Sequence, residues 1–383
     1  MPKINPEVLI WARERAGLSA EEAARALGLS GTNAVARLEE METGEREPTR
    51  RQIGEMAKKY RRPLLTFYLP GPPAAGKRTH DFRTLPERVA GSEALLDALV
   101  RDVKARQALV LSAMEEADEA VPLPFVGSVR AGAGAEALAN AMQQTLGLDL
   151  ARYRAARTLD DAFRLLRDAA EQAGVFVILM GNLGNFRSDL SPNVFRGFSM
   201  ADPIAPFIVI NETDSRSAWP FTLLHELGHI FLGESGISGY ESDMAIERLC
   251  DDAAARLLLP QRELAALHIH PQLDATVAEI GNFATARKVS RKMVAYNMLR
   301  AGHITRQLYR DLSDRFDTER LERGRGEARG QPDYYVVRRH RVGQGLLRLV
   351  DRLVAGGTLN ATKAGRVLGV KPTGVRRMTE RAA

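Results

Sequence analysis

Two histidines and a glutamate are the residues of this sequence whose types and spacing are best suited to chemistry. They are His225, Glu226 and His229, in the run His-Glu-Leu-Gly-His. Residues four apart lie on one face of a helix, so both imidazoles can bind one metal ion. The glutamate then lies beside the ion and can take a proton from the water that the ion activates. The pattern therefore predicts a zinc hydrolase in which Glu226 is the catalytic base.

The residues around this motif are almost all apolar from Phe221 to Leu232, which predicts a buried helix. Two histidines and a glutamate in such a helix need partners, because an unpaired charge away from water is costly. A metal ion supplies that partner. The less favoured alternative is a pair of hydrogen-bonded core histidines beside an exposed glutamate.

A zinc site of this type needs a third protein ligand and leaves a fourth position open for water. Residues 245–259 predict a second helix that ends at Pro260. Glu247 follows His229 by 18 residues across a glycine-rich loop, a spacing that suits two helices sharing one ion. Glu247 is therefore the preferred third ligand. Asp251, one turn later, is expected to orient a metal ligand by a hydrogen bond without binding the ion itself. The competing acidic residues are Glu234, Glu241, Asp243 and Asp251.

The histidine motif and the second helix together resemble the ImmA/IrrE family of bacterial metallopeptidases. The motifs that carry the resemblance are His-Glu-Leu-Gly-His, Glu-x-x-Cys-Asp-x-x-Ala-Ala from Glu247, Leu-Leu-Leu-Pro, Pro206–Asn211, Phe221–Leu223 and Asp81-Phe82-Arg83. Members of that family cut transcriptional repressors of the helix-turn-helix type. The sequence departs from the family at Asp251, where asparagine is commoner.

The resemblance implies a particular site and a particular partner. It implies His225 and His229 as zinc ligands, Glu226 as the base and Glu247 as the third ligand. It also implies a helix-turn-helix repressor protein as the substrate. The residue that stabilises the oxyanion stays open among Tyr240, His268, His270 and Arg216.

The first 70 residues predict a separate bundle of short helices, at 6–16, 20–27, 32–41 and 50–60. Ser19 with Glu22, and Thr49 with Gln52, have the spacing of capping boxes at helix starts. Short helices joined in this way are typical of a helix-turn-helix domain, and the segment resembles an XRE-type (lambda-repressor-like) module. The residues expected to contact nucleic acid are Thr32, Asn33, Arg37, Arg50 and Arg51.

Acidic residues crowd the end of the third of these helices and the loop after it. They are Glu39, Glu40, Glu42, Glu45 and Glu47. Because acid repels phosphate, a protein-interaction module is an equal alternative to sequence-specific DNA binding. The basic residues between Arg50 and Arg62 could instead contact single- or double-stranded nucleic acid without sequence preference.

The rest of the chain predicts a mostly helical α+β fold. Residues 71–130 are expected to hold a linker and a long helix, 91–120, that braces the N-terminal module. Residues 131–313 are expected to form a zincin-like metallopeptidase domain. Its predicted parts are a flexible break at 131–135, helices at 159–173, 273–286 and 293–299, and a small sheet from 175–179, 195–198 and 207–210.

Residues 314–383 are expected to be a linker and a C-terminal helical region. The linker is the charge-rich run 314–329, and a short strand is predicted at 334–337. Helices follow at 346–355, 360–368 and 373–381. A plain helical cap on the peptidase is favoured over a second helix-turn-helix pair.

Charge, cysteine content and hydropathy indicate which partners and which cellular compartment are compatible with the sequence. The net charge of +6 and the pI near 9.5 permit nucleic-acid contact without establishing it. A single cysteine, Cys250, excludes an internal disulfide and suggests a reducing cytoplasm, where it would serve as a packing residue. No apolar run approaches the ~20 residues of a membrane span, and no signal segment is recognised at the N-terminus. A homodimer is an open expectation, because XRE-type modules often pair.

Two function classes follow. The first is an endopeptidase that cleaves a helix-turn-helix repressor in response to stress, DNA damage or phage. The second is a DNA-binding transcriptional regulator or antitoxin with a structural or sensory metal site. A structural zinc site has no use for Glu226 and usually closes its fourth position with protein. The intact glutamate therefore favours the endopeptidase.

Overall fold

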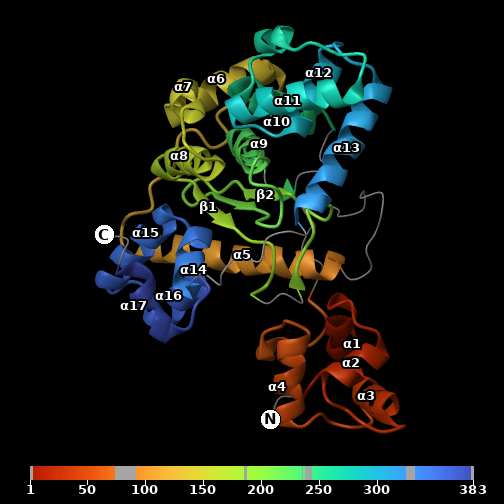
Figure 1. Ribbon diagram of the computed structural model, residues 1–383. Coiled ribbons are helices and arrows are strands. Elements are labelled where there is room, and N and C mark those ends of the chain that lie inside the picture. The colour runs from red at the N-terminus through yellow and green to blue at the C-terminus, as the bar shows by residue number, and fades with distance from the viewer. Residues whose placement is uncertain are drawn as a thin grey trace.

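The computed structural model describes residues 3–73, 92–184, 188–234, 236–237, 244–324 and 333–380. The fold is mostly helical α+β, as the sequence predicts, with helices on both faces of one small sheet (Figure 1).

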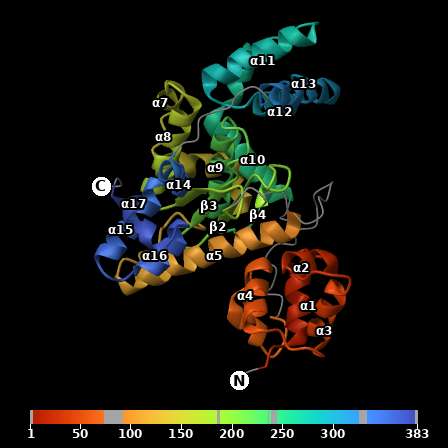
Figure 2. The ribbon, with the colours of Figure 1, turned by 60° about the horizontal axis from the view of Figure 1, so that its bottom comes forward.

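The N-terminal residues form a helical bundle with a core of its own. Its elements are α1 (Pro6–Arg15), α2 (Ala20–Ala26), α3 (Ala34–Thr43), α4 (Arg50–Lys59) and the 3-10 helix η1 (Leu64–Tyr68). Both predicted capping boxes are present, at the starts of α2 and α4. Leu9, Leu38, Ile53 and Phe67 belong to a separate buried cluster. Figure 2 shows the bundle as a distinct body.

The sheet has the order β1-β3-β2-β4. Its strands are β1 (Phe176–Leu179), β2 (Gly197–Met200), β3 (Phe207–Ile210) and β4 (Gly236–Ile237). β1 and β3 are parallel, and β2 is antiparallel to both β3 and β4. The prediction of the first and third strands is confirmed to within one residue. The strand expected at 195–198 begins at Gly197 and runs further, and β4 is too short to give a period-two signal.

One face of the sheet is covered by the helix that carries the histidine motif. Alternate strand residues, such as Val177 and Ile208, share a buried cluster with Leu223, Leu227 and other residues of α9 (Trp219–Leu232). The other helices of this layer are α6 (Gly134–Leu146), α7 (Leu150–Arg154), α8 (Leu159–Gln172) and α10 (Met244–Leu258). The break expected at 131–135 is instead the 3-10 helix η2 (Ala131–Ala133) and the start of α6.

Further helices lie on the same side of the sheet. They are the 3-10 helix η4 (Gln261–Ala266), α11 (Leu273–Arg287), α12 (Arg291–Arg300) and α13 (Arg306–Gly324). The prediction of a mobile linker from residue 314 is wrong as far as Gly324, because Phe316 packs into the main core. Charged residues of this helix form ion pairs with α12, Glu319 with Arg291 and Asp317 with Lys292.

The opposite face of the sheet is covered by α5 (Ser92–Glu116) and the C-terminal helices. Leu99 and Val103 of α5 share a buried cluster with Phe207 of β3. The apolar side of this helix packs on the sheet and against α15 and α16. Asp97 and Arg101, on its first turns, interact electrostatically with Arg62 of the N-terminal bundle, so the expected brace stays a prediction. The helix therefore belongs to the body that holds the site, not to a linker.

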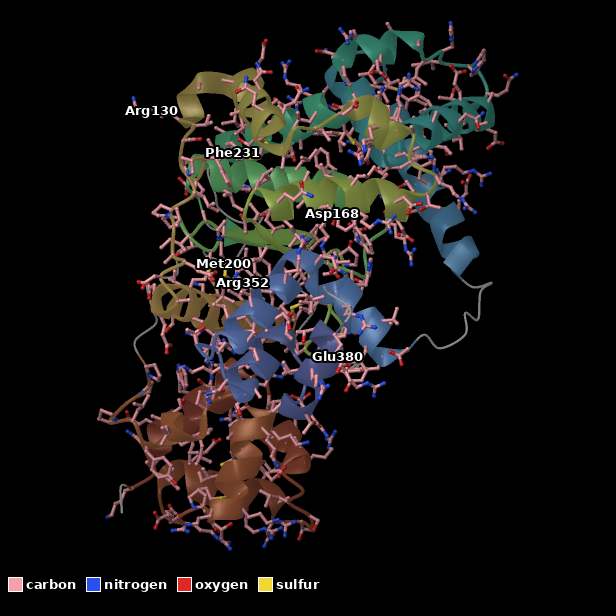
Figure 3. The ribbon with its side chains drawn as sticks, turned by 90° about the vertical axis from the view of Figure 1, so that its left-hand side faces the viewer. Arg130, Asp168, Met200, Phe231, Arg352 and Glu380 are labelled. Carbon is pink, nitrogen blue, oxygen red and sulfur yellow. The ribbon has the colours of Figure 1, made fainter. Side chains whose placement is uncertain are left out.

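The C-terminal helices complete this second layer. They are α14 (Tyr334–Val342), α15 (Gln344–Ala355), α16 (Ala361–Leu368), the 3-10 helix η5 (Pro372–Gly374) and α17 (Val375–Thr379). The strand predicted at 334–337 is wrong because Asp333 caps a helix there, accepting from the backbone N–H groups of Tyr335 and Val336. Figure 3 shows the layers from the side, with Asp168 of α8 above Met200 of β2, and Arg352 and Glu380 below it.

A buried ion pair joins the C-terminal helices to the other layer. Arg167 of α8 pairs with Glu171 and donates to the backbone carbonyl oxygens of Val177 and His340. Glu171 accepts from the backbone N–H of Gly345 at 2.7 Å. These contacts make the C-terminal region a fixed cap, which agrees with the favoured expectation for it.

Candidate metal centre

His225 and His229 are placed by α9, which is buried along almost its whole length. Pro220 lies in the first turn of the helix, and Gly233 ends it in the left-handed conformation. The two imidazoles lie one turn apart, with their Nε2 atoms 3.1 Å from each other. The histidine side chains are each 7% exposed. The helix therefore presents two nitrogen donors at one point.

Glu247 reaches the same point from α10. Its carboxylate oxygens lie 3.2 Å from Nε2 of His225 and 3.4 Å from Nε2 of His229. Donors about 2.1 Å from a tetrahedral zinc ion are about 3.4 Å apart, so the three donors fit one ion. Within the described residues, this is the group of His, Cys, Asp and Glu side chains close enough to hold a metal.

A glycine lets the two helices approach closely enough for this arrangement. A Cβ atom at Gly228 of α9 would lie 3.1 Å from Sγ of Cys250 on α10, closer than side chains normally pack. Cys250 is buried there, and burial raises the pKa of its thiol. It is therefore a packing residue at the helix contact, as expected from the sequence.

Asp251 lies behind the first histidine. Nδ1 of His225 donates to Oδ1 of Asp251 at 2.8 Å, because a carboxylate only accepts. This bond keeps the proton on Nδ1 and leaves Nε2 for the ion. Burial lowers the pKa of His225, but hydrogen bonds to Asp251 and Glu247 outweigh it and raise the pKa to about 10. A metal ion must therefore displace a proton from the site when it binds.

The side chain of Glu226 is fully buried beside His225, His229 and Glu247, where α9 packs against β2. A Cβ atom at Gly197 of β2 would lie 2.8 Å from Oε1 of Glu226 and 2.6 Å from Cγ2 of Thr222. A glycine is therefore required at this point of the strand. No sequence signal marks Gly197, because the close approach joins residues that are far apart in the chain.

An open cleft of about 720 Å³ leads to these residues. His225, Glu226, Glu247 and Asp251 line it, with residues 192–196 and side chains of α12 and α13 around them. Its large apolar and aromatic lining residues are Val194, Phe195, Phe221, Met293, Tyr296 and Tyr309. A cleft of this size and character suits a peptide segment with bulky side chains.

The other residues that the sequence offered as oxyanion donors or as metal ligands lie away from the cleft or outside the described residues. Arg216 pairs with Asp160 of α8, and His268 and His270 surround Glu279. None of these three basic residues lines the cleft. Glu234 is exposed just after α9. Tyr240, Glu241, Asp243 and the Asp81-Phe82-Arg83 tripeptide lie outside the described residues.

The residues expected to contact nucleic acid lie in the N-terminal bundle. Thr32 and Asn33 are exposed before α3, Arg50 and Arg51 are exposed in the first turn of α4, and Arg37 donates to the backbone oxygen of Ser30. Among the nearby acidic residues, Glu42 is buried and forms two hydrogen bonds with Arg13, at 2.7 and 3.0 Å. The charge of Glu42 is therefore neutralised within the bundle, and this one carboxylate does not add to the repulsion of phosphate.

Comparison with known families indicates a peptidase class for the segment that carries the His-Glu-x-x-His helix. Residues 170–299 match the family model Peptidase_M78, described as the IrrE N-terminal-like domain. The match supports the resemblance of this segment to the ImmA/IrrE family. It contains every residue of the candidate metal centre, and the N-terminal bundle lies outside it. No curated protein and no solved structure matches the chain. Among the described helices, none has both the length and the apolar composition needed to cross a membrane.

Proposed function

We propose that this protein is a zinc-dependent endopeptidase that cleaves a helix-turn-helix transcriptional repressor. The observation that carries the proposal is the spacing of the donors from His225, His229 and Glu247, with Glu226 beside them in an open cleft. The peptidase family of residues 170–299 supports the reaction class. Cleavage of the repressor would switch on a response to stress, DNA damage or phage.

The donor set favours zinc over other ions. Two imidazoles and one carboxylate are a common ligand set of catalytic zinc, and the cleft leaves room for a fourth ligand. When bound, such an ion would lower the pKa of the attacking water and polarise the scissile carbonyl.

Residues of the chain provide proton transfer, orient a metal ligand and bind the substrate. Glu226 accepts the proton of the attacking water and passes it to the leaving nitrogen of the peptide. Asp251 orients His225 through its Nδ1 proton. The large apolar side chains around the cleft bind the substrate segment and exclude water from the reacting bond.

The N-terminal bundle is proposed to bring the substrate or nucleic acid to the peptidase. Binding of nucleic acid is supported by four exposed residues of the bundle, Thr32, Asn33, Arg50 and Arg51. The same residues support the alternative function, a DNA-binding regulator or antitoxin with a structural or sensory metal. That alternative is the weaker one, because a structural zinc site is closed by protein ligands and this cleft is open.

The test is to incubate the zinc-loaded protein with the helix-turn-helix repressors encoded beside its gene and to identify fragments by mass spectrometry. We expect one cut, lost on adding a chelator and in Glu226→Gln. If the protein holds zinc but cuts none of these repressors and binds their operator DNA, the endopeptidase proposal is wrong and the DNA-binding regulator is supported instead.

A further inference from the structure

The C-terminal helices α16 and α17 are joined as in a helix-turn-helix pair, the less favoured of the two expectations for this region. Asn360 caps α16 by accepting from the backbone N–H of Lys363, and Gly369 ends the helix in the left-handed conformation. After a short turn at 369–371, residues 372–379 are helical, as η5 followed by α17. Many DNA-binding domains present their second helix after a short turn of this kind.

The turn fixes the second helix against the first. A Cβ atom at Gly365 would lie 2.8 Å from the backbone oxygen of Val370, so the turn lies directly on α16. The backbone N–H of Val370 donates to the carbonyl oxygen of Gly365 at 2.8 Å. The apolar sides of both helices are buried in the cluster that they share with α5 and the sheet, through Ala364, Val367, Leu368, Val375 and Met378. Their opposite sides face outward, at the end of the larger body (Figures 1 and 2).

The positive charge of the protein is concentrated in this region. Residues 333–380 contain ten lysines and arginines and three acidic residues, a net charge of +7, whereas the whole chain carries +6. The rest of the chain is therefore close to neutral. A basic region on an otherwise neutral protein is the electrostatic footprint of a surface that binds nucleic acid.

The outward side of the second helix carries part of this charge. Thr373, Arg376, Arg377 and Glu380 are exposed and share one face, because they are three or four residues apart. Lys371 is exposed in the turn just before them. Arg376 pairs with Glu380, whose end of the helix faces the viewer in Figure 3. No acidic residue that the structure describes forms an ion pair with Lys371 or Arg377, so their charges are available to a partner.

We propose that α16 and α17 bind double-stranded DNA, with the exposed face of η5 and α17 in the major groove. Lys371 and Arg377 contact phosphates, and Thr373 and Arg376 lie on the face that reaches the base edges. Arg377 is already ordered, because its guanidinium stacks on the ring of Tyr335 at 4.4 Å. This surface belongs to the body that holds the metal centre, and it is separate from the N-terminal bundle.

The composition of the surface favours DNA over a protein partner. Between residues 360 and 380, no large apolar or aromatic side chain is exposed. Protein interfaces depend on such side chains as buried anchors, whereas DNA interfaces are polar and strongly basic. The role as a cap is compatible with this one, since the cap uses the buried sides of the same helices.

The experiment measures binding of the full-length protein to a fluorescent duplex of about 20 base pairs by anisotropy, between about 50 and 200 mM salt. The variant Lys371→Ala/Arg377→Ala removes two phosphate contacts. We expect its affinity to fall about 10-fold or more, and the plot of log affinity against log salt to become shallower by about 2. Thermal stability and zinc content should stay near those of the wild type.

The control is Arg157→Ala/Arg262→Ala, which removes the same charge from two exposed arginines outside the surface and should bind like the wild type. Glu380→Gln is a second test, because it removes the acidic side chain from the binding face and releases Arg376. We expect its affinity for the duplex to rise about 2- to 10-fold, a gain that misfolding cannot produce. Arg50→Ala/Arg51→Ala measures the contribution of the N-terminal bundle separately.

Four results would overturn the proposal. The first is no binding of the duplex at the lowest salt. The second is equal affinity in the Lys371/Arg377 variant and its control, with loss confined to Arg50→Ala/Arg51→Ala. The third is tighter binding of the single strand than of the duplex, because a single strand has no major groove. The fourth is binding of polyglutamate but not of the duplex, which would indicate an acidic protein as the partner.

Discussion

Glu226 and the residues around it show how few positions the proposed chemistry depends on. A Cβ atom at Gly197 of β2 would lie 2.8 Å from its carboxylate, and a Cβ atom at Gly228 of α9 would lie 3.1 Å from Sγ of Cys250 on α10, the helix that carries Glu247. Two glycines therefore help to determine how closely the ligands and the base approach one another.

Glu226→Gln should keep the metal and lose the activity. Glutamine has nearly the same shape but cannot accept the proton, so we expect cleavage to slow by about 100- to 10,000-fold. The measurement is repressor cleavage alongside zinc content by atomic emission. Cleavage at the wild-type rate would remove Glu226 from the role of base.

Glu247→Ala and Asp251→Asn should affect the metal to different degrees. Loss of a direct ligand should leave far less than the expected one zinc per chain, whereas loss of the partner of His225 should weaken affinity about 10- to 100-fold. Competition with a chromogenic chelator measures both. Unchanged affinity in Glu247→Ala would show that another residue is the third ligand.

Gly197→Ala should impair cleavage although the substitution adds only one methyl group. The new Cβ atom would lie 2.8 Å from Oε1 of Glu226, so the carboxylate must move. We expect a clear loss of kcat and a loss of about 1–3 kcal/mol in stability from overpacking. Gly132→Ala is the control, because nothing lies within 4 Å of its added Cβ. Equal activity in the two variants would contradict the role given to Gly197.

At the scale of elements, the position of α9 depends on layers packed on both sides of the sheet. α10 brings Glu247, α12 and α13 supply the wall of the cleft, and α8 connects to the C-terminal cap through Arg167 and Glu171. This last contact is buried, so breaking it should cost more than breaking an ion pair at the surface.

Arg167→Ala should strongly destabilise the protein. It leaves Glu171 buried without its cationic partner, which typically costs about 3–5 kcal/mol. Arg376→Ala removes the exposed pair with Glu380 and should cost well under ~1 kcal/mol. Urea unfolding of the two variants makes the comparison, and similar midpoints would show that the buried pair does not hold the cap.

At the scale of the molecule, the structure contains a helical bundle with its own core and a larger body that includes the peptidase segment. The larger body extends beyond residues 170–299, because α5 and the C-terminal helices cover one whole face of its sheet. The bundle is therefore separable in a way that the C-terminal region is not.

Removing residues 1–73 should leave a folded protein that binds zinc, since the bundle has a separate buried cluster. Removing residues 333–383 should prevent folding, because Phe176 and Phe207 would lose part of their cover. Circular dichroism and zinc content test both truncations. A folded, zinc-binding protein without its C-terminal helices would contradict the assignment of α14 to α17 to the core.

The sequence by itself determined the features that depend on local spacing. His225 and His229 share a face because a helix repeats every 3.6 residues, capping residues mark the starts of α2 and α4, and a two-helix hairpin brings Glu247 toward the histidines. Only the tertiary structure decided that α5 packs on the sheet, that α13 is a helix, that Gly197 makes room for Glu226 and that Tyr296 faces the cleft. These features depend on contacts between distant segments, and the energy of such a contact leaves no periodic signal in either segment.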